Sequence, residues 1–160
     1  MKAIRMAAAA TAALLAGSLA LSSEPDSPVE TITYETGPCF GACPVYRLTV
    51  LSTGTGTFEG RRNTAVTGLR SFRVTPEQYR AFERQLAPAR PSSGSARYVG
   101  DSCQNQATDL PSVQVGWHSR LGHQQLDFSY GCDMERNRAL AERLRSAPDL
   151  LPIAAFVGSR

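Results

Sequence analysis

Two pairs of segments alternate between apolar and polar residues, and they limit the fold more than any other feature of the sequence. In the first pair, residues 45–51 place Tyr46, Leu48 and Val50 on one face, and the turn residues 53–55 separate them from Phe58. In the second pair, residues 113–118 and residues 125–130 alternate in the same way. A period of two is typical of a strand with one buried face, so the sequence predicts two β-hairpins.

The turns between the paired segments predict a register for each hairpin. A three-residue loop over 53–55, with Gly54 at positive φ, would pair Val50 with Phe58. A four-residue loop over 119–122 would pair Val115 with Leu126 and place the apolar side chains of both strands on one face. The same register puts His118 opposite His123.

One helix is expected after each hairpin. Thr75-Pro76-Glu77-Gln78 has the pattern of a capped helix start, and Tyr79, Phe82 and Leu86 follow at helical spacing until Pro88. Asp133 is expected to cap a second helix that turns Leu140, Ala141 and Leu144 inward. Residues 88–112 contain many prolines, glycines and serines and are expected to form a long irregular loop. The apolar residues 150–157 are expected to dock on the core as an edge strand.

These elements predict an α+β fold, in which an antiparallel sheet of about five to six strands is covered on one face by two helices. The chain has 160 residues, of which 42% are hydrophobic and 19% charged, and this length suits one domain. We assign residues 31–157 to that single domain and residues 23–30 to a flexible segment that leads into it.

The first 22 residues have the pattern of a cleavable signal peptide. Lys2 and Arg5 precede a short apolar run of mostly alanine residues, and small residues suitable for cleavage follow. The run is shorter than the roughly 20 apolar residues that span a membrane, so no stable membrane insertion is expected after cleavage. Residues 14–17 are similar to the start of a bacterial lipoprotein processing site, but Ser18 stands where the lipid-bearing cysteine would be. We therefore expect a periplasmic or secreted protein without a lipid anchor.

Export also changes the charge and the expected state of the cysteines. Loss of Lys2 and Arg5 leaves 15 of the 17 basic residues against 14 acidic ones, so the mature chain is nearly neutral and no nucleic-acid partner is expected. The four cysteines, an even count in an oxidising compartment, predict two disulfides. Four cysteines allow three pairings, and at this point all three stay open; the residues are Cys39, Cys43, Cys103 and Cys132.

The segment Cys39-Phe40-Gly41-Ala42-Cys43-Pro44-Val45-Tyr46 resembles the motif Cys-x-Gly-x-Cys-Pro-x-Tyr of a bacterial family, the domain of unknown function numbered 6438. The motif positions are Cys39, Gly41, Cys43, Pro44 and Tyr46. Members of this family are similar in being exported, and the resemblance implies no activity, ligand or catalytic residue. Many members have only the first cysteine pair, which implies a disulfide between Cys39 and Cys43 here and leaves Cys103 with Cys132.

Three kinds of chemistry bear on these residues: thiol–disulfide exchange, metal binding and hydrolysis. A redox-active Cys39–Cys43 pair is the alternative function, but thioredoxin-type sites have two intervening residues and a helix after the first cysteine, whereas Pro44 here leads into a strand. The cysteine spacing fits no recognised zinc pattern, and His118 with His123 has no third ligand nearby. Neither the Gly-x-Ser-x-Gly motif nor the His-Glu-x-x-His motif of hydrolases is present. We expect a non-catalytic role in binding or envelope support, without metal or cofactor, whose partner is an unknown envelope protein or small ligand.

Overall fold

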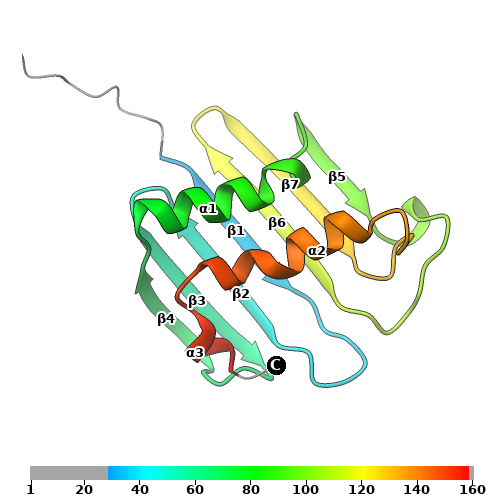
Figure 1. The fold of residues 1–160 in the computed structure, drawn as a ribbon, viewed down its shortest axis with the longest axis horizontal. Helices are drawn as coiled ribbons and strands as arrows, with labels where there is room; N and C mark the ends of the chain where they lie inside the picture. Colours follow the sequence, from blue (N-terminus) through cyan, green and yellow to red (C-terminus); the bar gives the residue numbers. More distant parts are fainter. Residues whose placement is uncertain (1–28, 159–160) are drawn as a thin grey trace, which may run out of the picture.

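The computed structural model describes residues 29–158, so the expected signal peptide and most of the leading segment lie outside the described residues. Seven strands form one sheet in the order β4-β3-β2-β1-β6-β7-β5 (Figure 1). Their bounds are β1 (Thr31–Thr36), β2 (Val45–Leu51), β3 (Thr55–Arg62), β4 (Gly68–Arg73), β5 (Gly94–Tyr98), β6 (Ser112–Ser119) and β7 (Gly122–Ser129). The α+β class is confirmed, whereas the expected count of five to six strands is too low.

The additional strand is β5, which lies inside the segment expected to be an irregular loop. It pairs with β7 in parallel, with Ala96 opposite Leu126 and Tyr98 opposite Phe128. Ala96 and Tyr98 pack against the core, but this inward alternation covers only five residues and is bordered by serine and glycine. Such a short alternating stretch is hard to distinguish from a loop, and the strand that pairs with it, β7, lies about thirty residues further along the chain.

The helices α1 (Pro76–Leu86) and α2 (Arg138–Ser146) lie across the same face of the sheet (Figure 1), and no helix of residues 29–158 covers the other face. The capping box that begins α1 is present: the Gln78 N–H bonds the Thr75 hydroxyl, and the Thr75 N–H bonds the Gln78 side chain. The core fills the space between sheet and helices, where Ile32, Trp117 and Phe82 are fully buried. No helix within residues 29–158 has the length and apolar character needed to cross a membrane.

The second hairpin has the expected register, since Val115 faces Leu126, Val113 faces Phe128 and His118 faces His123. Its turn is tighter than expected, because Ser119 and Gly122 also pair. The first hairpin differs by two residues: Leu48, not Val50, lies opposite Phe58. The reason is Gly54, whose φ of 93° suits the last position of a three-residue loop over 52–54 rather than the middle of 53–55. A shift of two keeps the apolar side chains on the same face.

Two expectations near the C-terminus are wrong. Asp133 does not cap α2, because the first residue of that helix is Arg138. The Asp133 carboxylate instead accepts hydrogen bonds from the backbone N–H groups of Gln104 (3.1 Å) and Asn105 (2.8 Å). The tail is not an edge strand but a 3₁₀ turn (Ala147–Leu150) followed by the short helix α3 (Ala154–Val157). Leu151, Ile153 and Val157 still reach the core, as the apolar character of the tail requires.

Candidate functional site

The cysteine motif forms a loop between β1 and β2 that is fixed to the rest of the domain. The structure joins Cys39 to Cys43 by a disulfide, with the two Cα atoms 5.7 Å apart, and Gly41 between them has a φ of 135°. Three hydrogen bonds hold the loop: the Gly37 N–H to the Ser112 carbonyl (2.8 Å), the Phe40 N–H to the Asp109 carbonyl (3.1 Å) and the Asn63 amide to the Cys43 carbonyl (3.1 Å). A closed loop with these anchors has little conformational freedom left.

The tip of this loop presents an apolar surface to solvent. Phe40 is 88% exposed, the highest value among the large hydrophobic residues of the described chain. Pro38 and Ala42 on either side are also exposed, and Leu110, which follows the residue that bonds the Phe40 N–H, is 41% exposed. We call these four residues, Pro38, Phe40, Ala42 and Leu110, the Phe40 tip.

A small hollow lies beside the Phe40 tip, where the ends of β1, β2 and β6 meet α2. It has a volume of about 150 Å³, and the motif residues Cys43, Pro44 and Tyr46 line one side. The remaining lining includes Tyr34, Pro111, Tyr130 and Arg145. The motif therefore has a spatial counterpart, since three of its five positions meet at one surface depression.

Aromatic contacts set the floor of the hollow. The Tyr34 and Tyr46 rings stack with centroids 6.5 Å apart, and the Tyr34 hydroxyl donates a hydrogen bond of 2.8 Å to the Leu144 carbonyl. This bond attaches α2 to β1 directly above the hollow. The Arg145 guanidinium lies 4.8 Å from the centre of the Tyr130 ring and is the only charged group of the lining. The hollow therefore suits an apolar group next to a negative charge.

The second disulfide joins Cys103 to Cys132, with the Cα atoms 5.3 Å apart. It attaches the segment after β5 to the end of β7, where Cys132 is buried and the Ala107 N–H bonds the Gly131 carbonyl at 2.9 Å. Both disulfides thus have the pairing that the resemblance implies. The Cys103–Cys132 disulfide lies apart from the hollow and constrains the segment that leads to Leu110.

The environment of Cys39 and Cys43 differs from that of a thioredoxin-type pair. The residue after Cys43 is Pro44, and the chain continues directly into β2, so neither sulfur lies at the N-terminus of a helix. A helix terminus is the usual means of lowering a thiol pKa. Residues 29–158 also contain no group of three or more histidine, cysteine, aspartate or glutamate side chains placed to hold a metal ion together.

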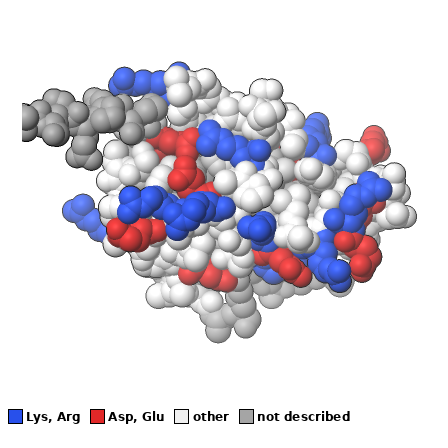
Figure 2. Space-filling model, turned by 45° about the horizontal axis from the view of Figure 1, so that its top comes forward, with Lys and Arg blue, Asp and Glu red and all other residues white. Residues whose placement is uncertain are grey.

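Six residues of the hollow were not expected from the sequence as site residues: Tyr34, Thr36, Pro111, Ser112, Tyr130 and Arg145. Tyr34 and Tyr130 fall on apolar strand faces, where core packing is the simpler interpretation, and Arg145 fits the solvent side of the second helix. Only the tertiary arrangement brings them next to Pro44. On the surface seen from the helix side, positive and negative side chains are interspersed without a broad area of one sign (Figure 2).

The fold and the site define an α+β domain with a helix-covered sheet, two disulfides and a motif loop at one end. The chain belongs to the family described as "Domain of unknown function (DUF6438)", whose model matches residues 30–148. A comparison with curated proteins finds no sequence that matches this chain.

Proposed function

We propose that this protein is an exported, non-catalytic binding domain that uses the Phe40 tip and the adjoining hollow to contact another protein of the cell envelope. The signal-peptide pattern of residues 1–22 and the two disulfides support a periplasmic or secreted location, since disulfides persist in oxidising compartments. The family supplies no activity, so the binding role is argued from this surface alone.

The observation that carries the proposal is the 88% exposure of Phe40 on a loop that a disulfide and three hydrogen bonds hold in place. Exposing a phenylalanine on a rigid loop gains nothing for the folded monomer. Burying an aromatic ring of roughly 150–250 Å² against a partner contributes several kcal/mol at about 25 cal/mol per Å². Because the loop is already ordered, association loses little further conformational entropy.

The hollow adds specificity to this anchor. Its apolar lining by Pro44, Tyr46 and Pro111 accepts an apolar side chain of the partner, while Arg145 at its edge pairs with a neighbouring carboxylate. Arg145 already lies against Tyr130, so its guanidinium is held in one place before the partner arrives. We therefore infer a partner segment in which an apolar residue stands next to an acidic one.

The test compares Phe40 with Leu121, which is 87% exposed but lies in the turn between β6 and β7. A photo-crosslinking amino acid is placed at position 40 or 121 of the full chain in an exporting host. We expect a discrete adduct from position 40 in the envelope fraction and none from position 121. Binding of the identified partner to purified protein should weaken at least tenfold in Phe40→Ala and in Arg145→Gln, and stay unchanged in Leu121→Ala.

Equal adducts from both positions, or equal affinity of Phe40→Ala and the parent protein, would show that the Phe40 tip is not the contact surface. The melting temperature of each variant is measured alongside. Because Phe40 and Leu121 are almost fully exposed, neither alanine variant should be destabilised.

A further inference from the structure

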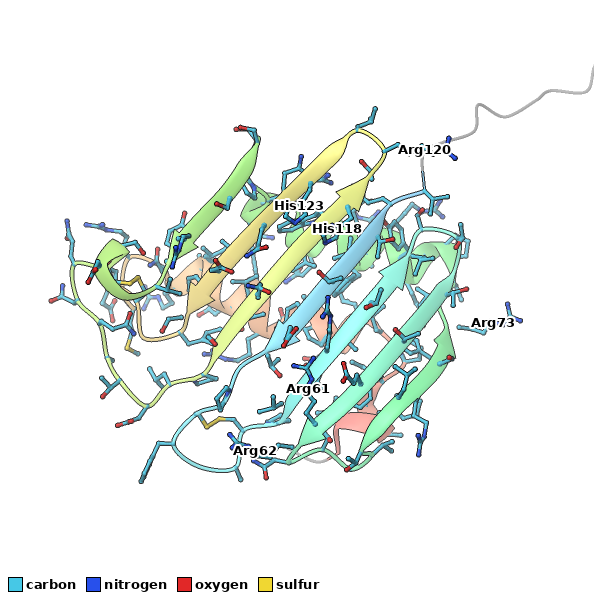
Figure 3. The ribbon with its side chains drawn as sticks, turned by 180° about the vertical axis from the view of Figure 1, so that it is seen from behind. Arg61, Arg62, Arg73, His118, Arg120 and His123 are labelled. Atoms are coloured by element: carbon cyan, nitrogen blue, oxygen red, sulfur yellow. A yellow bond between two sulfur atoms is a disulfide. The ribbon has the colours of Figure 1, made fainter. Side chains whose placement is uncertain are left out.

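A second candidate site lies on the open face of the sheet, far along β6 and β7 from the disulfide loop. His118 and His123 are register partners on these two strands, and both are exposed. Their ring centroids are 4.4 Å apart with 34° between the ring planes. Figure 3 shows the two labelled side chains next to each other on the face that no helix covers.

The absence of a side chain at Gly116 makes room for the His118 ring. A Cβ atom placed on Gly116 would lie only 2.8 Å from His118 Nε2 and 2.6 Å from the Thr33 hydroxyl oxygen. The imidazole therefore lies back over Gly116, in space that any other residue would fill. The pair thus depends on Gly116 as well as on the register of the hairpin.

The surroundings of His118 lower its affinity for a proton. Partial burial, the neighbouring His123 and the positive charge of Arg47 all lower the pKa of His118. The neutral imidazole is the form that binds metal. The charge of Arg47 is itself partly offset by Glu35, whose carboxylate lies 3.7 Å from the guanidinium.

We propose that His118 and His123 together bind one Cu²⁺ ion, with water in the remaining coordination positions. A metal–imidazole bond of about 2.0–2.1 Å places two nitrogens on one ion at most about 4 Å apart. Rings whose centroids are 4.4 Å apart, on register partners of one hairpin, are close enough to bring one nitrogen each to a shared ion when their side chains turn. Cu²⁺ is favoured because it binds nitrogen ligands most strongly among the divalent first-row ions and accepts a tetragonal site completed by water.

The test is a titration of the full mature chain with Cu²⁺, followed by calorimetry and by electron paramagnetic resonance. The variants are His118→Asn, His123→Asn and the double variant, which measures any binding by the rest of the chain. If the two imidazoles share one ion, each single variant should weaken binding at least tenfold because the chelate is lost, and the double variant should bind no more tightly than either single variant. The resonance spectrum of the parent protein should report two nitrogen ligands.

Two independent surface histidines would behave differently, and either of two results would overturn the proposal. One is a stoichiometry of two ions per chain, of which each single variant removes one. The other is an affinity that the double variant leaves unchanged. Both histidines are exposed, so the asparagine variants should fold, and their melting temperatures without metal serve as the check.

Discussion

Val115 on β6 lies directly opposite Leu126 on β7, and neither side chain has any surface exposed to solvent. Core side chains fill the space between these two residues and the helices, so a charge at position 115 would have no partner. We expect Val115→Asp to lower the free energy of unfolding by several kcal/mol, about the cost of burying an unpaired polar or charged group.

The control is Gln114→Lys on the same strand, because Gln114 is exposed and faces away from the helices. It should change the free energy of unfolding by no more than about 0.5 kcal/mol. Urea denaturation followed by circular dichroism measures both variants. Equal midpoints for Val115→Asp and the parent protein would mean that the two faces of β6 are assigned the wrong way round.

This hairpin also shows why much of the fold is predictable. Its pairing depends on local alternation and a short turn, and both are visible in residues 113–130. The capping box at Thr75 is equally local. In the first hairpin the alternation predicts the buried face but not the register, because a shift of two residues keeps the same side chains inside.

The features that the sequence does not predict depend on distant contacts. Strand β5 exists because β7 offers its edge, and Asp133 turns away from α2 because the N–H groups of Gln104 and Asn105 need an acceptor. The hollow also depends on contacts between distant parts of the chain. Cys43, Pro44 and Tyr46 belong to a recognisable motif, but Arg145 reaches them from a helix about a hundred residues later.

Asp133 gives the domain a dependence on pH. The two backbone N–H groups, that of Asn105 foremost, hold the pKa of its carboxyl below the ordinary value. A carboxyl whose pKa is lower in the folded state stabilises that state fully above its unfolded pKa of about 3.9, and this stabilisation is lost as the pH falls through the lower folded value. Asp133→Asn should therefore lower the melting temperature at pH 7, and the difference from the parent protein should shrink as the pH falls toward 2.

Asparagine is a suitable replacement because the backbone at position 133 has a φ of 42°, which asparagine tolerates well. The control is Asp101→Asn in the turn Gly100–Ser102, which makes the same chemical change at an exposed position. Melting temperatures are measured for both variants and the parent between pH 2 and 7. A difference for Asp133→Asn that stays constant over this range would contradict the role assigned to its carboxylate.

The Cys39–Cys43 pair is expected to be structural rather than redox-active. With no helix terminus at either sulfur, neither thiol of the reduced protein should have the low pKa of a catalytic cysteine. We expect the native disulfide to resist mild dithiothreitol, and alkylation of the reduced pair to slow down tenfold for each pH unit below about 8. Rapid alkylation of one of the two cysteines that persists at pH 6 would instead favour the thiol–disulfide exchange function.

Export is predicted from residues 1–22, which lie outside the described structure. The positive start, the short apolar run and the small residues that follow predict removal of 20 to 23 residues by signal peptidase. Intact-mass measurement of the protein recovered from the periplasm of an exporting host checks this. Recovery of a chain that still begins at Met1 would remove the main support for a periplasmic location.

The two disulfides should contribute unequally to stability. In the chain-entropy model, the loop closed by Cys39 and Cys43, which are 4 positions apart, contributes roughly 2 kcal/mol. The loop closed by Cys103 and Cys132, which are 29 positions apart, contributes roughly 3.6 kcal/mol. Cys132 is also buried, whereas Cys39 and Cys43 are only half-buried. Replacement of Cys103 and Cys132 by serine should therefore lower the free energy of unfolding more than the same replacement of Cys39 and Cys43.

Denaturation of the two double-serine variants under oxidising conditions measures this difference, and the parent protein in reductant gives the value for the loss of both disulfides. Peptide mapping without reduction checks the pairing first. A peptide that links residue 39 or 43 to residue 103 or 132 would contradict the pairing, and four free thiols would contradict the oxidising compartment. A third outcome is a peptide map that agrees while the replacement of Cys39 and Cys43 lowers the free energy of unfolding more. In that case the anchored loop stabilises the domain through packing at the hollow, which Tyr46 lines, as well as through chain entropy.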